Sequence, residues 1–149
     1  MVKIINGDLF DSKANIIAHQ VNCQGVMGSG VALQVKQKYP NVYEGYKRIC
    51  NGKMLGKIQL IPINSHKQMI CNIFGQDSCG YDGRQYTSIE ALSQCFRELA
   101  YFATKNKYTI AMPYGIGCVR GGADWNKVYQ MIEDIFVDGI VELWKWDRG

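Results

Sequence analysis

Short apolar segments alternate with helical patterns along the chain, and this alternation limits the possible folds more than any other feature. Helical spacing of apolar residues lies between segments that are short and apolar enough to be buried strands. The strands are expected at Val2 to Ile5, Asn15 to Val21, Ile58 to Ile63, Met69 to Phe74, Thr109 to Met112 and Ile140 to Trp146. Strands alternating with helices predict an α/β fold, a three-layer α/β/α sandwich around a mainly parallel, mixed six-stranded sheet.

The clearest helix is predicted from Ser88 to Lys105, where Leu92 and Phe96 belong to an apolar stripe with spacings of three and four. Thr87 and Glu90 have the spacing of a capping box at its start. Three further helices are expected over residues 30–40, 42–50 and 124–136. Pro40 ends the first of them, and Asn51-Gly52 ends the second in the manner of a left-handed C-cap. Asp124 is the expected N-cap of the third.

Composition limits the class of protein. A chain of 149 residues with 47% apolar residues predicts one folded domain spanning 1–149. No apolar run approaches the roughly 20 residues of a membrane span, and the polar N-terminal sequence is not typical of a signal peptide. Six cysteines without a C-x-x-C motif predict reduced thiols in a cytoplasmic protein with no metal site. We also expect a monomer.

The charge balance favours a small anionic ligand. Lys and Arg number 17 against 13 Asp and Glu, which leaves a net charge of +4 without a run of basic residues. Such a mild excess argues against a dedicated nucleic-acid binder. Neither a nucleic acid nor a membrane is therefore expected as a partner.

A glycine-rich loop follows the second expected strand. It runs from Asn22 through Gly25, Met27 and Gly28 to Ser29-Gly30, and it enters a helix at Val31. Glycines permit close backbone approach, and a helix start offers free N–H groups with a partial positive charge. The loop predicts a phosphate site, although its spacing matches neither the Rossmann nor the P-loop pattern.

A second loop of the same kind follows the fifth expected strand. It comprises Pro113, Tyr114, Gly115, Ile116, Gly117, Cys118, Val119, Arg120, Gly121 and Gly122. Two such loops side by side would hold a diphosphate from both sides through charge-assisted contacts. The alternative is that the glycines only form tight turns.

Taken together, these motifs resemble the macro domain family, an α/β/α module that binds ADP-ribose. The resemblance covers essentially the whole chain and rests on Asn6-Gly7-Asp8-Leu9-Phe10, on His19 to Gly30, and on Met112 to Cys118 before Asp124-Trp125. It is greatest for the branch of small proteins that includes yeast-type ADP-ribose 1''-phosphate phosphatase and terminal ADP-ribose protein glycohydrolase.

The resemblance implies a set of ligand contacts. Asp8, followed by Leu9, would accept a hydrogen bond from the adenine amine, with a turn-capping role as the alternative. Trp144 would stack on adenine, although Trp144 and Trp146 share one strand face and either is otherwise a core residue. Asn22 would contact the distal ribose. The diphosphate and distal ribose would lie against Gly28, Ser29, Gly30 and residues 115–118.

The same resemblance narrows the chemistry. The terminal glycohydrolase branch uses a Lys and an Asp, but here Gly75-Gln76-Asp77 stands where the Lys is expected and Gly121 stands where the Asp is expected. Phosphatase chemistry needs donors and preferably a general acid or base. His19, Asn22 and Asp77 are the catalytic candidates; a satisfied core histidine and a solvated loop carboxylate are the alternatives for His19 and Asp77.

The expected function is ADP-ribose binding with hydrolysis of ADP-ribose 1''-phosphate or a related 1''-linked derivative, without a metal or cofactor. Two alternatives remain: a non-catalytic ADP-ribose reader, and a glycohydrolase that removes ADP-ribose from protein or nucleic acid.

Overall fold

A computed structural model describes residues 1–80, 82 and 84–146 and has the expected six-stranded sheet. The strands are β1 (Val2–Asn6), β2 (Ile16–Val21), β3 (Ile58–Ile63), β4 (Gln68–Phe74), β5 (Ile110–Pro113) and β6 (Val141–Lys145). Their order across the sheet is β1-β6-β5-β2-β4-β3. All pairs are parallel except the β3–β4 pair, which confirms the prediction of a mixed, mainly parallel sheet.

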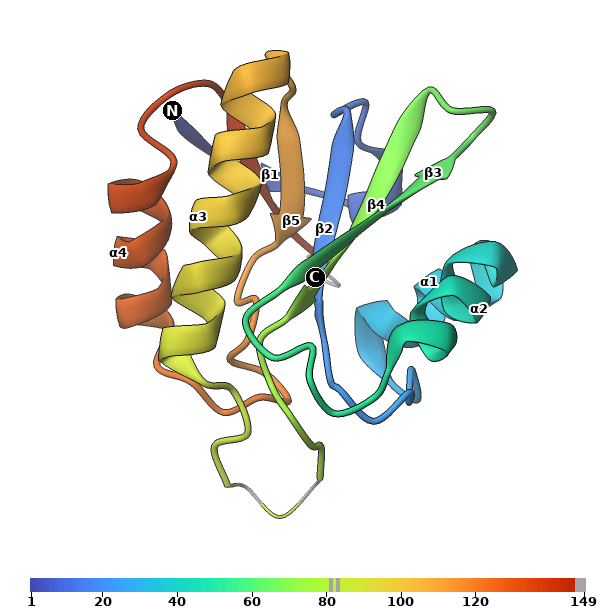
Figure 1. Ribbon diagram of the computed structural model, residues 1–149. Helices are drawn as coiled ribbons and strands as arrows, with labels where there is room; N and C mark the ends of the chain where they lie inside the picture. Colours follow the sequence, from blue (N-terminus) through green and yellow to red (C-terminus); the bar gives the residue numbers. More distant parts are fainter. Residues whose placement is uncertain (81, 83, 147–149) are drawn as a thin grey trace.

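Helices cover both faces of the sheet, as Figure 1 shows. On one side lie α3 (Ile89–Asn106) and α4 (Trp125–Ile135); on the other lie α1 (Gly30–Lys38) and α2 (Pro40–Ile49). A short 3-10 helix, η1 (Leu9–Asp11), follows β1. No described helix combines the length and apolar character that a membrane crossing requires.

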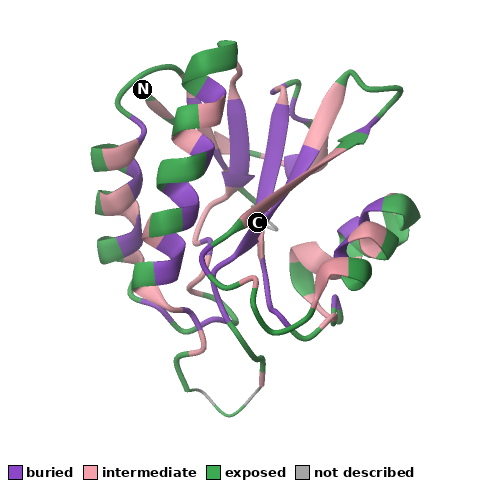
Figure 2. Cartoon of the chain, viewed as in Figure 1, coloured by how far each residue is buried: buried purple, intermediate pink, exposed green. Residues whose placement is uncertain are grey.

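Two apolar clusters hold the layers together because successive strand residues point to opposite faces. Ile16 and Ala18 of β2 pack with Leu92, Phe96 and other residues beneath α3 and α4. Ile17 and Val21 pack with Val35, Val42 and Tyr46 beneath α1 and α2. The central strands β2 and β5 and most of β4 are accordingly purple in Figure 2, the edge strand β3 is mainly pink, and the outer helix faces are largely green.

The helix ends differ from the sequence-based predictions in several details. α2 begins at Pro40 and not at Val42, because proline is well suited to the first helical position. Ser88, not Thr87, caps α3, because the Ser88 side chain accepts a hydrogen bond from the Ala91 N–H and leaves no role for a Thr87–Glu90 capping box. At the end of α2, Cys50 is the C-cap with an extended backbone, and the left-handed residue is Gly52, two positions later. Asp124 caps α4 as predicted, through Asn126 N.

Candidate functional site

A cavity of about 490 Å³ opens at the carboxyl edge of the parallel strands. β2 and β5 are neighbours in the sheet, so the glycine loops that follow them lie side by side and form two walls of the cavity. Its volume is typical of a site for a small organic ligand, which is about 300–1,000 Å³. The adjacency expected from the sequence is therefore present.

Most residues proposed from the sequence line this cavity. They are Asp8, Leu9, His19, Asn22, Gly28, Ser29, Gly30, Val31, Pro113, Tyr114, Gly115, Ile116, Gly117 and Trp144. Gly25, Met27, Cys118 and Asp77 do not line it. Met27 is buried in the apolar cluster beneath α1 and α2, so its side chain supports the first loop from behind.

The first glycine loop is shaped by the side chain of Asn22. Its Oδ1 accepts a hydrogen bond from Gln24 N at 2.9 Å, and its Nδ2 donates to Val26 O at 2.8 Å. The buried Tyr46 hydroxyl lies 2.7 Å from Asn22 O and 2.8 Å from Asn22 Oδ1, which connects the loop to α2. The amide is thus largely engaged within the protein, and its bonds fix the path of the loop.

Close packing shapes the second loop. Gly117 has φ +79°, and a Cβ atom there would lie 3.2 Å from Gln20 Oε1 and 3.3 Å from Leu92 Cδ2. At Gly121 a Cβ atom would overlap the Thr87 hydroxyl and come within 2.5 Å of Gly117 O. The loop as folded therefore has no space for a side chain at position 121.

One end of the cavity carries Asp8 and Trp144. Asp8 Oδ1 accepts a hydrogen bond from Phe10 N at 3.0 Å and caps η1, so the turn-capping role is real. Asp8 also lines the cavity. Trp144 donates from Nε1 to Glu142 Oε1 at 2.9 Å, and a Cβ atom on Gly7 would lie 3.1 Å from its Cζ3. These contacts hold the half-buried indole in a defined orientation.

His19 lies deeper in the cavity wall. Its side chain is buried, and Nε2 lies 2.6 Å from Asn72 Oδ1. Asn72 Nδ2 donates to Gln59 Oε1 at 3.0 Å, and Gln59 Nε2 donates to Gly45 O of α2 at 3.1 Å. Because the acceptor of Asn72 faces His19, Nε2 carries the proton and Nδ1 is an acceptor; Nδ1 has no hydrogen-bond partner among the described residues.

This environment keeps His19 neutral. Burial lowers its pKa to about 4, against a smaller upward effect of the hydrogen bond with Asn72. A neutral imidazole with so low a pKa is a weak general base near pH 7, but it remains a hydrogen-bond acceptor. The position therefore suits orientation of a bound group better than proton transfer.

A second polar group lies on the other side of β2. Gln20 Nε2 donates to Gln76 Oε1 and to Thr87 Oγ1, both at 2.7 Å. Gln76 Nε2 in turn donates to Ser78 O at 2.8 Å, and Thr87 Oγ1 donates to Gly117 O at 2.7 Å. This network joins the cavity wall to the segment between β4 and α3.

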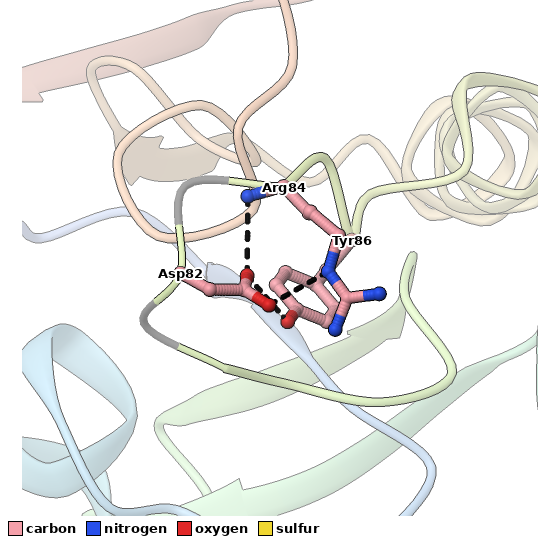
Figure 3. A network of polar contacts seen from close by, with 3 residues as sticks. All are labelled: Asp82, Arg84 and Tyr86. Carbon is pink, nitrogen blue, oxygen red and sulfur yellow. Dashed lines mark hydrogen bonds and ion pairs between the residues drawn. The ribbon is translucent and has the colours of Figure 1, made fainter.

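The segment between β4 and α3 forms one margin of the cavity, and hydrogen bonds hold both its base and its tip. At the base, Tyr86 N and Thr87 N both donate to Gly121 O, at 2.7 and 3.0 Å. At the tip, Tyr86 Oη donates to Asp82 Oδ1 at 2.7 Å, and Arg84 Nε lies 2.7 Å from Asp82 Oδ2 (Figure 3). The hydrogen bond from Tyr86, followed by those from Arg84, lowers the pKa of Asp82.

Asp77 lies in the same segment but outside the cavity. Its side chain is exposed, and Oδ1 lies 3.4 Å from Gln24 Nε2. Its backbone oxygen accepts a hydrogen bond from Cys23 N at 2.9 Å. The residue thus connects the segment to the first glycine loop.

The cysteines are reduced, and burial raises the pKa of those next to the two loops. All six cysteines are described, and each is a free thiol. Burial, followed by the charges of Asp77 and Cys50, raises the pKa of Cys23 to about 11; burial and Asp124 do the same for Cys118. No cluster of three or more potential metal ligands occurs within the described parts of the chain.

Several cavity residues were missed by the sequence reasoning. They are Gly7, Gln20, Val21, Val26, Ala32, Gln34, Gln76, Cys79 and Gly80. Val119, Arg120, Gly121 and Trp146 also line the cavity, and the sequence had placed them in the second glycine loop and on the last strand. Some of the missed residues carry a signal that was available. Gln20 is a polar residue at the end of an apolar strand, and Gln76 follows the end of β4, where the other ligand-facing loops also begin.

Comparisons with known proteins agree with this geometry. The family model described as the macro domain matches residues 18–132. A DNA ADP-ribosyl glycohydrolase of Mycobacterium tuberculosis is 30% identical over 91% of this chain and 39% of its own length. An ADP-ribose 1''-phosphate phosphatase of Debaryomyces hansenii is 38% identical over 44% of this chain and 43% of its own. The chain thus spans about two fifths of these curated relatives.

A solved structure shows the same fold over its full length. The macrodomain of Thermus aquaticus DarG superposes with a TM-score of 0.79 at 25% identity, covering 99% of this chain and 98% of that one. With the family model matching well over half of the residues, the chain belongs to the macro domain family.

Proposed function

We propose that this protein binds ADP-ribose and hydrolyses a derivative substituted at C1'', with ADP-ribose 1''-phosphate as the first candidate substrate. One observation carries the proposal: two glycine loops meet at the ends of adjacent parallel strands, with Asp8 and Trp144 at one end of the same cavity. Backbone N–H groups of both loops would bind the diphosphate, and each charge-assisted contact contributes about 1.5–3 kcal/mol. The names of both curated relatives contain ADP-ribose, which supports this choice of ligand.

The remaining contacts follow from the position of the diphosphate. Adenine would stack on Trp144, while the second carboxylate oxygen of Asp8 would accept from the adenine amine. The distal ribose would then point toward Asn22 and His19. In that position His19 Nδ1, an acceptor without a protein partner among the described residues, would accept a hydrogen bond from a ribose hydroxyl or from the attacking water.

Hydrolysis of the phosphate ester requires water to attack phosphorus and the bond to the C1'' oxygen to break. The products are ADP-ribose and inorganic phosphate, and the departing oxygen takes up a proton. Loop N–H groups would stabilise the charge that develops on the phosphoryl oxygens. His19 and Asn22 would orient the reacting groups. Asp77 would reach them only if its segment moved toward the cavity, because its side chain now lies outside.

Calorimetry with ADP-ribose and a phosphate-release assay with ADP-ribose 1''-phosphate test the two parts separately. We expect binding in the micromolar range and slow turnover that EDTA leaves unchanged. Absence of heat up to millimolar ligand refutes the binding site. Binding without phosphate release leaves the second candidate, a reader of ADP-ribose.

A glycohydrolase remains a second enzymatic candidate because a curated relative carries that name. The lysine and aspartate expected from the terminal glycohydrolase branch are absent here, where Gly75-Gln76-Asp77 and Gly121 stand in their places. Release of ADP-ribose from a modified protein or oligonucleotide by the wild-type chain would establish this activity through a different set of groups.

A further inference from the structure

The positive charge of the chain is concentrated in one layer of the fold. Residues 30–56, which span α1, α2 and the start of the following loop, contain five cations against one carboxylate. Their net charge of +4 equals the net charge of the entire chain. By contrast, α3 holds two cations and two carboxylates, and α4 holds one cation and two carboxylates.

The five cations are Lys36, Lys38, Lys47, Arg48 and Lys53, and all of them are exposed. None has a carboxylate within ion-pair distance among the residues that the structure describes. Lys36 Nζ lies 4.5 Å and Lys47 Nζ 5.3 Å from the centre of the Tyr43 ring, so these two cations of α1 and α2 meet on the same side. Lys38 Nζ lies 5.4 Å from the centre of the Phe10 ring, which follows β1. We call this surface the α1–α2 basic face.

The α1–α2 basic face is next to the cavity. The first turn of α1 lines the cavity wall, and Tyr46 of α2 contacts Asn22 of the first glycine loop. A Cβ atom on Gly25 would lie 3.9 Å from Cys50 Cβ, so the end of α2 packs against the outer side of that loop. Lys47 and Arg48 belong to this last turn of α2.

We propose that the α1–α2 basic face binds the phosphate backbone of a nucleic acid strand whose ADP-ribose substituent enters the cavity. A nucleic acid presents regularly spaced phosphates, and neutralising them releases condensed counterions. Lys47 and Arg48 at the end of α2, beside an opening for a diphosphate ligand, suit such a partner, and Lys36 and Lys38 at the end of α1 extend the same positive layer. The proposal rests on the proposed function, since the substituent that enters the cavity is ADP-ribose.

The test uses a fluorescein-labelled, unmodified single-stranded oligonucleotide of about 20 nucleotides, with anisotropy measured between about 50 and 200 mM salt. If all five cations contact phosphates, log Kd should change with log salt with a slope of about 3.5, from roughly 0.7 per contact on single strands. The double variant K47Q/R48Q should bind about tenfold or more weakly at the lowest salt, with the slope reduced by about 1.4.

The matched control is R97Q/K105Q, which removes the same charge from exposed positions on α3. A loss of two positive charges outside the site should change the affinity for the oligonucleotide by only about twofold. R97Q/K105Q should therefore bind clearly more tightly than K47Q/R48Q. Thermal unfolding of both variants checks the fold, since Lys47 and Arg48 also compensate the dipole of α2.

The outcomes separate this proposal from the proposed function. Equal loss in the two double variants, or no salt-dependent binding by the wild type, overturns the basic face. Equally strong binding of a polyglutamate peptide assigns the surface to acidic polypeptides and also overturns it. ADP-ribose calorimetry is run in parallel: retained ADP-ribose binding without oligonucleotide binding defeats only this inference, whereas loss of ADP-ribose binding in the wild type defeats the proposed function.

Discussion

Acidification should destabilise this protein through His19. The pKa of His19 is 6.5 in the unfolded chain and about 4 in the native structure, where the imidazole is buried. Between these two values the unfolded state binds a proton that the native state does not. The free energy of unfolding must therefore fall as pH falls through this window, and the contribution of His19 is complete only above pH 6.5.

The magnitude follows from the difference between the two pKa values. Linkage gives a loss of about 2 kcal/mol by about pH 5 and of roughly 3 kcal/mol below the native pKa. Carboxylates also titrate in this range, so the wild type alone cannot isolate the effect. His19→Gln removes the titration, and its side-chain amide can still donate to Asn72 Oδ1.

The assay is urea denaturation of both proteins at about pH 7.5 and about pH 5. The wild type should lose about 2 kcal/mol more than His19→Gln between the two pH values, whatever their difference at neutral pH. An NMR titration of the imidazole, assigned with the variant, should give a midpoint near 4 for His19. Equal losses in the two proteins, or a midpoint near 6.5, would refute the reasoning that burial keeps this histidine neutral.

Three further changes test other parts of the site. Trp144→Ala should weaken ADP-ribose binding by about 1–3 kcal/mol through lost stacking, as measured by calorimetry, and unchanged affinity contradicts the proposed place of adenine. Gly121→Ala should destabilise the fold by about 1–3 kcal/mol in chemical denaturation, because its Cβ would overlap the Thr87 hydroxyl; wild-type stability would show that the loop has space. The exposed Cys79 should react first with a disulfide reagent near neutral pH. Cys23 should react slowly, because its pKa is raised to about 11. A fast phase of the reaction that survives Cys79→Ser counts against this order.

Strand positions were predictable because burial in a parallel sheet demands short apolar runs. β2 and β4 begin and end within about a residue of the prediction, since Ile16 to Val21 and Met69 to Phe74 are bounded by polar residues. The N-cap of α3 was misplaced by one residue. Thr87 and Ser88 are chemically similar as N-caps. The hydroxyl of Thr87 instead donates a hydrogen bond to Gly117 O.

Candidate residues in the loops after β2 and β5 were found because helix starts and glycines are visible in the sequence. The roles of His19 and Gln20 were not, since each depends on partners far along the chain. His19 faces Asn72, and Gln20 contacts Gln76 and Thr87. Asp77 was proposed as a carboxylate in the loop segment after the fourth strand, but its side chain does not line the cavity.

Total charge was a poor guide to the distribution of charge. A net charge of +4 over 149 residues indicated only a small anionic ligand. Packing of α1 against α2 brings Lys36 and Lys47 to one aromatic ring and places the end of α2 beside the first glycine loop. A local surface potential depends on these distances and not on the sum of charges.

The sequence by itself determined the elements of this protein, because periodicity, glycines and caps act over a few residues. It also determined where backbone donors are available for an anion, at the loops that leave two buried strands. Only the tertiary structure decided that β2 and β5 are neighbours, that His19 is held neutral by a buried amide, and that the basic helices border the opening. Each of these depends on contacts between residues far apart in the chain, and such contacts exist only once the sheet has formed.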